Sequence, residues 1–129
     1  MNVTPEVMDW VRKAEDDLLA SRRVAEGTPP LPDQIGFFCQ QAAEKYLKAF
    51  LLAVGQSPPR THDVDVLLEM CAVEDPAFER LRPMVGGLTE FAVVFRYPGE
   101  WSDMAAASQA LIKAREIQTL VRKKLRLTA

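Results

Sequence analysis

Histidine and cysteine are scarce in this chain, which holds one histidine, His62, and two cysteines, Cys39 and Cys71, among 129 residues. A zinc site of the usual cysteine and histidine type therefore lacks enough ligands within one chain. Both cysteines stand among apolar neighbours in helical patterns, so we expect two buried small side chains rather than a disulfide framework. The residues indicate no metal and no cofactor that the fold requires.

Long apolar runs and a strong charge imbalance are also missing. No apolar stretch approaches the roughly 20 residues that span a bilayer, and residues 1–10 lack a basic start followed by an apolar segment. We therefore expect a cytoplasmic protein without membrane contact. With 16 basic and 18 acidic residues the net charge is -2, which argues against a broad nucleic-acid surface but allows a local basic patch.

Apolar residues do not alternate with period two between turn signals, so strands have little support. Apolar residues instead recur at helical spacing, and the breakers between them predict helices at residues 5–26, 33–54, 62–73, 76–96 and 103–127. We expect the fourth to be kinked or broken at Pro83 and Gly86-Gly87. Short connections between amphipathic helices predict an all-α fold, an antiparallel four- to five-helix bundle, as one domain over 1–129.

Hydroxyl side chains stand where three of these helices begin. Thr4 precedes Pro5, and the pair is typical of an N-cap followed by proline in the first turn. Thr61 and Ser102 precede the third and the last helical patterns. We therefore predict that these three side chains cap the helices that follow them.

The second predicted helix is apolar over more than half its circumference, which indicates a central position in the bundle. Its remaining surface is a polar strip that holds Gln40, Gln41, Glu44, Lys45 and Lys48. Phe37 and Leu52 project from this polar side, which indicates that it also meets protein. A second copy of the chain is the most economical cover, so we predict a homodimer.

Three motifs together carry a family resemblance. The first is the stretch Gln40-Gln41-Ala42-Ala43-Glu44-Lys45 within residues 37–51, followed by Gly55 and Pro58-Pro59-Arg60-Thr61-His62. The others are Ala14-x-x-Asp17-Leu18 upstream and Arg96-Tyr97-Pro98 downstream. Over nearly its whole length the chain resembles the HEPN domain, an all-helical family linked to nucleotide binding and RNA cleavage.

The resemblance implies several functions, because HEPN proteins include ribonuclease toxins, partners of small nucleotidyltransferases, and members without the cleavage motif. HEPN ribonucleases use an arginine and a histidine with four to six residues between them, and that spacing is absent here. We therefore predict a non-catalytic domain that binds a nucleotide such as ATP, or an RNA phosphate. The resemblance further implies a separately encoded minimal nucleotidyltransferase as partner, in a toxin-antitoxin-like pair.

The predicted ligand contacts combine cations, polar groups and an aromatic ring. They are Gln41, Glu44, Lys45, Lys48, Arg60, His62, Arg96 and Tyr97. Gln41, Glu44 and Lys45 match the family stretch, while Arg60 and His62 precede a helix whose free amides favour phosphate. Arg96 and Tyr97 fall at a helix end, where a guanidinium holds phosphate and an aromatic ring stacks a base.

Each of these residues also has a structural interpretation. Glu44 and Lys48 form an ordinary i,i+4 pair, His62 helps to cap its own helix, and Arg60 is a solvated loop residue. Arg96 bonds terminal carbonyls, and Tyr97 packs against Trp101. The basic residues Arg122, Lys123, Lys124 and Arg126 complement the C-terminal dipole of the last helix.

Two other functions stay open beside the binding domain. One is a metal-independent ribonuclease toxin with its catalytic groups rearranged around His62 and Arg96, since such an enzyme needs a proton-transfer group and a cation. The other is a protein-interaction domain whose polar strip is only an interface.

Overall fold

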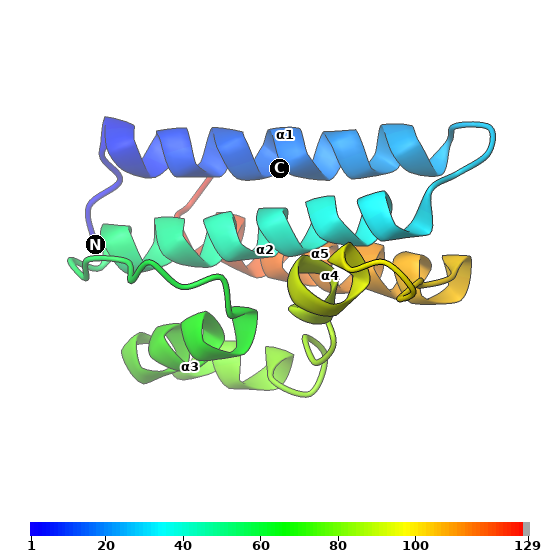
Figure 1. Cartoon of the computed structure of the whole chain (residues 1–129). Coiled ribbons are helices and arrows are strands. Elements are labelled where there is room, and N and C mark those ends of the chain that lie inside the picture. Colours follow the sequence, from blue (N-terminus) through cyan, green and yellow to red (C-terminus); the bar gives the residue numbers. More distant parts are fainter. Residues whose placement is uncertain (128–129) are drawn as a thin grey trace.

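The chain folds into a bundle of helices around one central helix. In the computed structural model, which describes residues 1–127, α1 (Pro5–Ala25) lies antiparallel beside α2 (Pro32–Ala53). On the other sides of α2 lie α3 (Val64–Glu74), α4 (Glu90–Val93) and α5 (Met104–Lys124) (Figure 1). The described residues contain no strand, and the predicted all-α bundle is confirmed.

The two longest neighbours of α2 run in different directions. Asp33 at the start of α2 accepts hydrogen bonds from Ser102 just before α5, and Tyr46 further along α2 receives one from Gln118 further along α5. α5 therefore runs parallel to α2, while α1 is antiparallel to both (Figure 1). The segment between α3 and α5 returns the chain to the end of the bundle where α2 begins.

The apolar circumference of α2 explains its central place. Tyr46 and Leu47 are fully buried, as is Phe50, whose ring centroid lies 4.6 Å from that of Phe78. Side chains of this size contribute about 1.5 to 3 kcal/mol each when they leave water. The central position predicted from the sequence is confirmed.

One of the three predicted caps is confirmed, and the other two helices are capped by a different residue. Thr4 caps α1 as expected, because its hydroxyl accepts a hydrogen bond from the amide of Val7 at 3.2 Å. The cap of α3 is Asp63 rather than Thr61, and the Thr61 hydroxyl instead accepts from the Asp63 amide. The cap of α5 is Asp103 rather than Ser102. Carboxylates are as good as hydroxyls in this role, and both caps also place a negative charge at the positive end of a helix.

The region between α3 and α5 is broken, as predicted. A 3₁₀ helix, Pro76–Leu81, is followed by turns that contain Pro83 and Gly87, whose φ of 92° suits glycine. The short α4 then continues into a second 3₁₀ turn, Val94–Arg96. This irregular segment brings Arg96 to the end of the bundle where α2 begins.

The cysteines behave as buried apolar side chains. Cys39 and Cys71 are both fully buried and unpaired with each other, as predicted. Burial raises the pKa of Cys39 to about 11 although the hydrogen bond with Ser21 lowers it, and burial also raises the pKa of Cys71. Neither thiol is activated as a nucleophile. No helix within residues 1–127 has both the length and the apolar character needed to cross a membrane.

Candidate functional site

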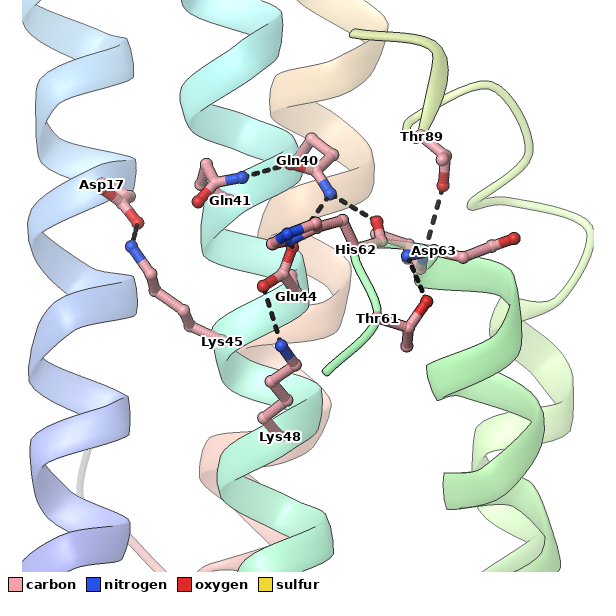
Figure 2. A network of polar contacts seen from close by, with 11 residues as sticks. Asp17, Gln40, Gln41, Glu44, Lys45, Lys48, Thr61, His62, Asp63 and Thr89 are labelled. Carbon is pink, nitrogen blue, oxygen red and sulfur yellow. Dashed lines mark hydrogen bonds and ion pairs between the residues drawn. The ribbon is translucent and has the colours of Figure 1, made fainter. Parts of the chain in front are cut away.

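The polar strip of α2 is largely buried. Gln40 is 0%, Glu44 4% and Lys48 6% exposed, although all three are polar or charged. Lys48 donates to Oε2 of Glu44 at 3.0 Å, and Gln40 donates to Oε1 of Glu44 at 3.3 Å (Figure 2). Glu44 and Lys48 therefore form a buried ion pair inside the bundle rather than a solvated i,i+4 pair. Removing one partner of a buried ion pair leaves an uncompensated charge in the core and is strongly destabilising.

The loop before α3 closes over this strip. His62 places Nδ1 3.0 Å from Oε1 of Glu44, and its main-chain carbonyl accepts a hydrogen bond from Gln40 at 2.8 Å. The imidazole remains 72% exposed while the carboxylate that it contacts is 5% exposed. Glu44, Lys48, Gln40 and His62 therefore form one group of polar contacts, the Glu44 cluster. The cap of α3 is Asp63 and not His62.

Helix α1 covers the rest of the strip. Lys45 forms an ion pair with Asp17 at 2.5 Å, and the Lys48 ammonium lies 5.7 Å from the centroid of the Trp10 ring. The strip thus meets protein, as predicted, but that protein is its own chain. A second copy is not needed to cover it, so this reason for a homodimer is removed.

Phe37 and Leu52, the two apolar residues on the polar side, also have intramolecular neighbours. The Phe37 ring centroid lies 6.0 Å from that of Phe38, and Leu52 packs half-buried against the core. The homodimer accordingly stays a prediction.

A second polar network links α1, α2 and α5, and sequence reasoning missed it. The Tyr46 hydroxyl donates to Glu15 at 2.5 Å, Gln118 donates to both residues, and Arg122 forms an ion pair with Glu15. Burial and the Glu15 carboxylate raise the pKa of Tyr46 above its usual range. Tyr46 lies on the apolar face of its helix, where only the position of a polar partner on another helix reveals the role of its hydroxyl.

Two of the basic C-terminal residues also form ion pairs. Arg122 bonds Glu15 on α1, and Lys124 pairs with Asp75 at 2.8 Å. Both therefore fasten α5 to other elements in addition to lying at the negative end of its dipole.

A cavity of about 600 Å³ opens at the end of the bundle where α2 begins. Six aromatic side chains line it: Phe37, Phe38, Phe91, Phe95, Tyr97 and Trp101. Its polar lining includes Asp33, Arg96 and Glu100. A concave, mainly aromatic surface with a few charged groups is typical of a small-molecule site.

Arg96 stands at this cavity with its guanidinium uncommitted. Its central carbon lies 5.2 Å from the centroid of the Phe37 ring. Within residues 1–127 the guanidinium has neither an ion-pair nor a hydrogen-bond partner, so it does not bond the terminal carbonyls as the structural interpretation supposed. Contact with an aromatic face orients the cation without using its N–H donors.

Tyr97 and Trp101 are the exposed aromatic residues of the cavity, with 65% and 79% of their surface in solvent. Their rings make no stacking contact with each other in the part of the chain that the structure describes, so the packing of Tyr97 on Trp101 is not observed. Exposed rings of this size remain available to a ligand.

Two contacts hold the cavity walls in place. Oδ1 of Asp33 accepts hydrogen bonds from the amide of Ser102 at 2.8 Å and from its hydroxyl at 2.6 Å. These bonds tie the loop that carries Trp101 to the first turn of α2. Gly36 allows the second contact, because a Cβ there would stand 2.0 Å from the Phe91 ring.

The predicted site residues therefore fall into separate groups. Gln41 donates to Gln40 and joins the cluster of Glu44, Lys48 and His62. Lys45 pairs with α1, and Arg60 lies exposed in the loop before α3. Arg96 and Tyr97 line the aromatic cavity, to which none of the other predicted residues contributes.

One protein-family model matches most of the chain. The family model described as HEPN domain matches residues 7–124, which is nearly the whole chain. Neither the curated proteins nor the solved structures gave a match. The matched range includes the motifs in residues 14–18, 37–51 and 96–98. The chain therefore belongs to the HEPN domain family, whose members are nucleotide- or RNA-related.

Proposed function

We propose that this HEPN domain binds a nucleotide or an RNA phosphate at the aromatic cavity and does not itself cleave RNA. The observation that carries the proposal is the uncommitted guanidinium of Arg96 at the mouth of a 600 Å³ cavity. A guanidinium with free donors binds phosphate oxygens in a bidentate manner. Stacking on Phe37 orients it before a ligand arrives, which lowers the entropy lost on binding.

The exposed rings of Tyr97 and Trp101 support the same proposal. Each base has a π face, and stacking of a base on an aromatic side chain contributes about 1 to 3 kcal/mol. A cation beside exposed aromatic rings is thus the combination that an unpaired nucleotide requires.

Contacts of His62 support a binding role over a catalytic one. The cleavage spacing is absent, and His62 contacts the Glu44 cluster rather than the cavity of Arg96. Acid-base catalysis needs the imidazole within hydrogen-bond reach of the reacting hydroxyl, with a cation at the phosphate.

We expect Arg96→Ala to weaken binding of ATP and of a short single-stranded RNA by about ten- to a hundredfold. This range corresponds to the loss of one charge-assisted contact of about 1.5 to 3 kcal/mol. Isothermal titration calorimetry on the purified chain measures the change. The matched control is Arg12→Ala, because Arg12 is an exposed arginine on α1 that does not line the cavity.

Equal weakening by Arg12→Ala and Arg96→Ala contradicts the proposed site and indicates diffuse electrostatic attraction instead. Unchanged binding in Arg96→Ala, with the wild-type melting temperature, leaves this residue a structural role only.

Purified protein is expected to leave single-stranded RNA intact over hours. His62→Ala is expected to shift the free energy of unfolding by no more than about 1 kcal/mol, because its ring is exposed and Glu44 keeps Lys48. Gel analysis of a labelled RNA tests the first expectation and thermal melting the second. RNA cleavage that disappears in His62→Ala, at unchanged stability, shows a ribonuclease with a rearranged site.

We further propose a homodimer that acts with a separately encoded minimal nucleotidyltransferase in a toxin-antitoxin-like pair. HEPN domains often form dimers, and the exposed Val93 lines a hollow together with Tyr97, which leaves an apolar side chain available there to a second copy. Light scattering is expected to give twice the mass of 14.4 kDa. A monomer mass at high micromolar concentration refutes the dimer. A neighbouring reading frame with a nucleotidyltransferase signature supports the pair.

A further inference from the structure

The cavity beside Arg96 holds two carboxylates, which a phosphate alone does not explain. Asp33 and Glu100 line it together with a single cation, Arg96. An anionic ligand that filled the whole cavity would be repelled by both carboxylates. The lining therefore suits a ligand that carries both an anion and N–H donors.

Asp33 is already half used by the protein. Its Oδ1 accepts two hydrogen bonds from Ser102, at 2.8 and 2.6 Å, while its Oδ2 has no donor within residues 1–127. The two bonds fix the direction of the carboxylate and hold the loop that carries Glu100 and Trp101. Asp33 is thus a positioning residue that also places a fixed negative charge at the cavity.

Glu100 is the carboxylate with both oxygens open. It lies in the loop between Tyr97 and Trp101, its side chain is exposed, and none of the described residues donates a hydrogen bond to it. An ionised carboxylate offers two acceptor oxygens side by side and no donor. It therefore selects a group that presents two parallel N–H donors.

Among the four RNA bases, guanine is the one that presents two adjacent N–H groups, N1–H and N2–H, on its Watson–Crick edge. Adenine and cytosine each offer one amino group beside a ring nitrogen whose lone pair faces the carboxylate, and uracil offers one N–H between two carbonyls. When one carboxylate oxygen faces a ring-nitrogen lone pair or a carbonyl oxygen of the base, one hydrogen bond is lost and the two acceptors repel each other.

We propose that the cavity selects a guanine nucleotide, an inference that rests on the proposed nucleotide-binding function. Glu100 accepts N1–H and N2–H of the base, Tyr97 and Trp101 stack its faces, and Arg96 binds its phosphate. The positive and negative groups of the lining then each meet a complementary part of one ligand.

Calorimetric titration of the full chain with GMP, IMP and AMP tests the selection. IMP keeps the N1–H of guanine but lacks the 2-amino group, and AMP lacks both donors. We expect GMP to bind at least about tenfold more tightly than AMP, with IMP between them. Glu100→Gln is expected to weaken GMP by about ten- to a hundredfold. The same variant is expected to bind AMP at least as tightly as the unmodified chain, because an amide donor replaces the acceptor that repels the lone pair of adenine N1. The matched control is Glu116→Gln, an exposed position on α5 outside the cavity.

The outcomes separate this inference from the proposed function. If GMP and AMP bind with equal affinity and both affinities fall in Arg96→Ala, guanine selection is wrong and the proposed nucleotide binding stands. Binding of a short adenine-only RNA, dependent on Arg96, without binding of any mononucleotide also overturns the selection alone. Binding of neither mononucleotides nor RNA overturns both. Because Glu100 is exposed in a loop, wild-type melting of Glu100→Gln is expected and excludes misfolding as the cause.

Discussion

Glu44→Ala is expected to lower the free energy of unfolding by about 3 to 5 kcal/mol, the range for removal of one partner from a buried ion pair. Glu44 is 4% and Lys48 6% exposed, so the substitution leaves an ammonium in the core without its carboxylate. His62 and Gln40 also lose an acceptor on Oε1 of Glu44. The Trp10 ring, 5.7 Å from the Lys48 ammonium, offsets only part of this cost. Urea unfolding followed by circular dichroism measures the change.

The matched control is Glu116→Ala, which removes an exposed helical carboxylate and is expected to change the free energy of unfolding by less than about 0.5 kcal/mol. The double variant Glu44→Leu with Lys48→Met removes both charges and is expected to recover most of the loss, because apolar side chains of similar volume replace a buried pair at little cost. A loss below about 1 kcal/mol in Glu44→Ala contradicts a closed, buried network and indicates that water reaches Lys48.

Gly36→Val is expected to destabilise the fold by about 3 kcal/mol, at or above the upper end for overpacked cores. A Cβ at this position stands 2.0 Å from Cδ1 and 2.1 Å from Cε1 of Phe91, so the ring and α4 have to move. Phe91 also lines the aromatic cavity, so we expect weaker ligand binding in the same variant. Urea unfolding and calorimetric titration together test both effects.

Gly86→Val is the control, because a Cβ at Gly86 meets nothing within 4 Å and its backbone does not require glycine. Phe91→Ala makes room for the side chain that Gly36→Val introduces. The double variant is therefore expected to lose less stability than the sum of the losses in the two single variants. Strict additivity of the two losses argues that Phe91 is not the group that Gly36 accommodates.

Local sequence determined the helices and the family. Thr4, Asp63 and Asp103 stand at helix starts, and Gly55 and Gly87 adopt the positive φ values of chain breaks. Apolar spacing along α2 was enough to predict its central place, because a helix that is apolar around most of its surface is covered on most sides. Such features depend on neighbours within one turn of a helix, and they are readable without a fold.

Two cap candidates stand at the start of α3 and two at the start of α5. Thr61 and Asp63 lie two residues apart, and Ser102 and Asp103 are adjacent, so both members of each pair suit a cap. Tertiary contacts decided the second case, because Ser102 donates to Asp33, 69 residues away. Asp103 then takes the cap of α5.

The polar strip shows most clearly what only the tertiary structure decided. Sequence alone indicated that Gln40, Glu44 and Lys48 share a face and that the face meets protein. It did not show that α1 and the loop at His62 supply that protein, because the contacts join residues 22 and 18 positions apart and across helices. Whether a charged face is solvated or buried depends on which segment packs on it, and the local sequence pattern does not specify that segment.

Long-range packing likewise assembled the cavity and the Tyr46 network. Asp33 and Phe37 meet Arg96 and Trp101 only because the segment between α3 and α5 returns the chain to the end of the bundle where α2 begins. Arg122 reaches Glu15 across 107 positions, and Tyr46 reaches it across 31. Hydrogen bonds and ion pairs act over a few ångströms in space, whereas helical periodicity reports neighbours in sequence. The helices were therefore encoded locally, and the groups that line the candidate site were brought together by tertiary packing.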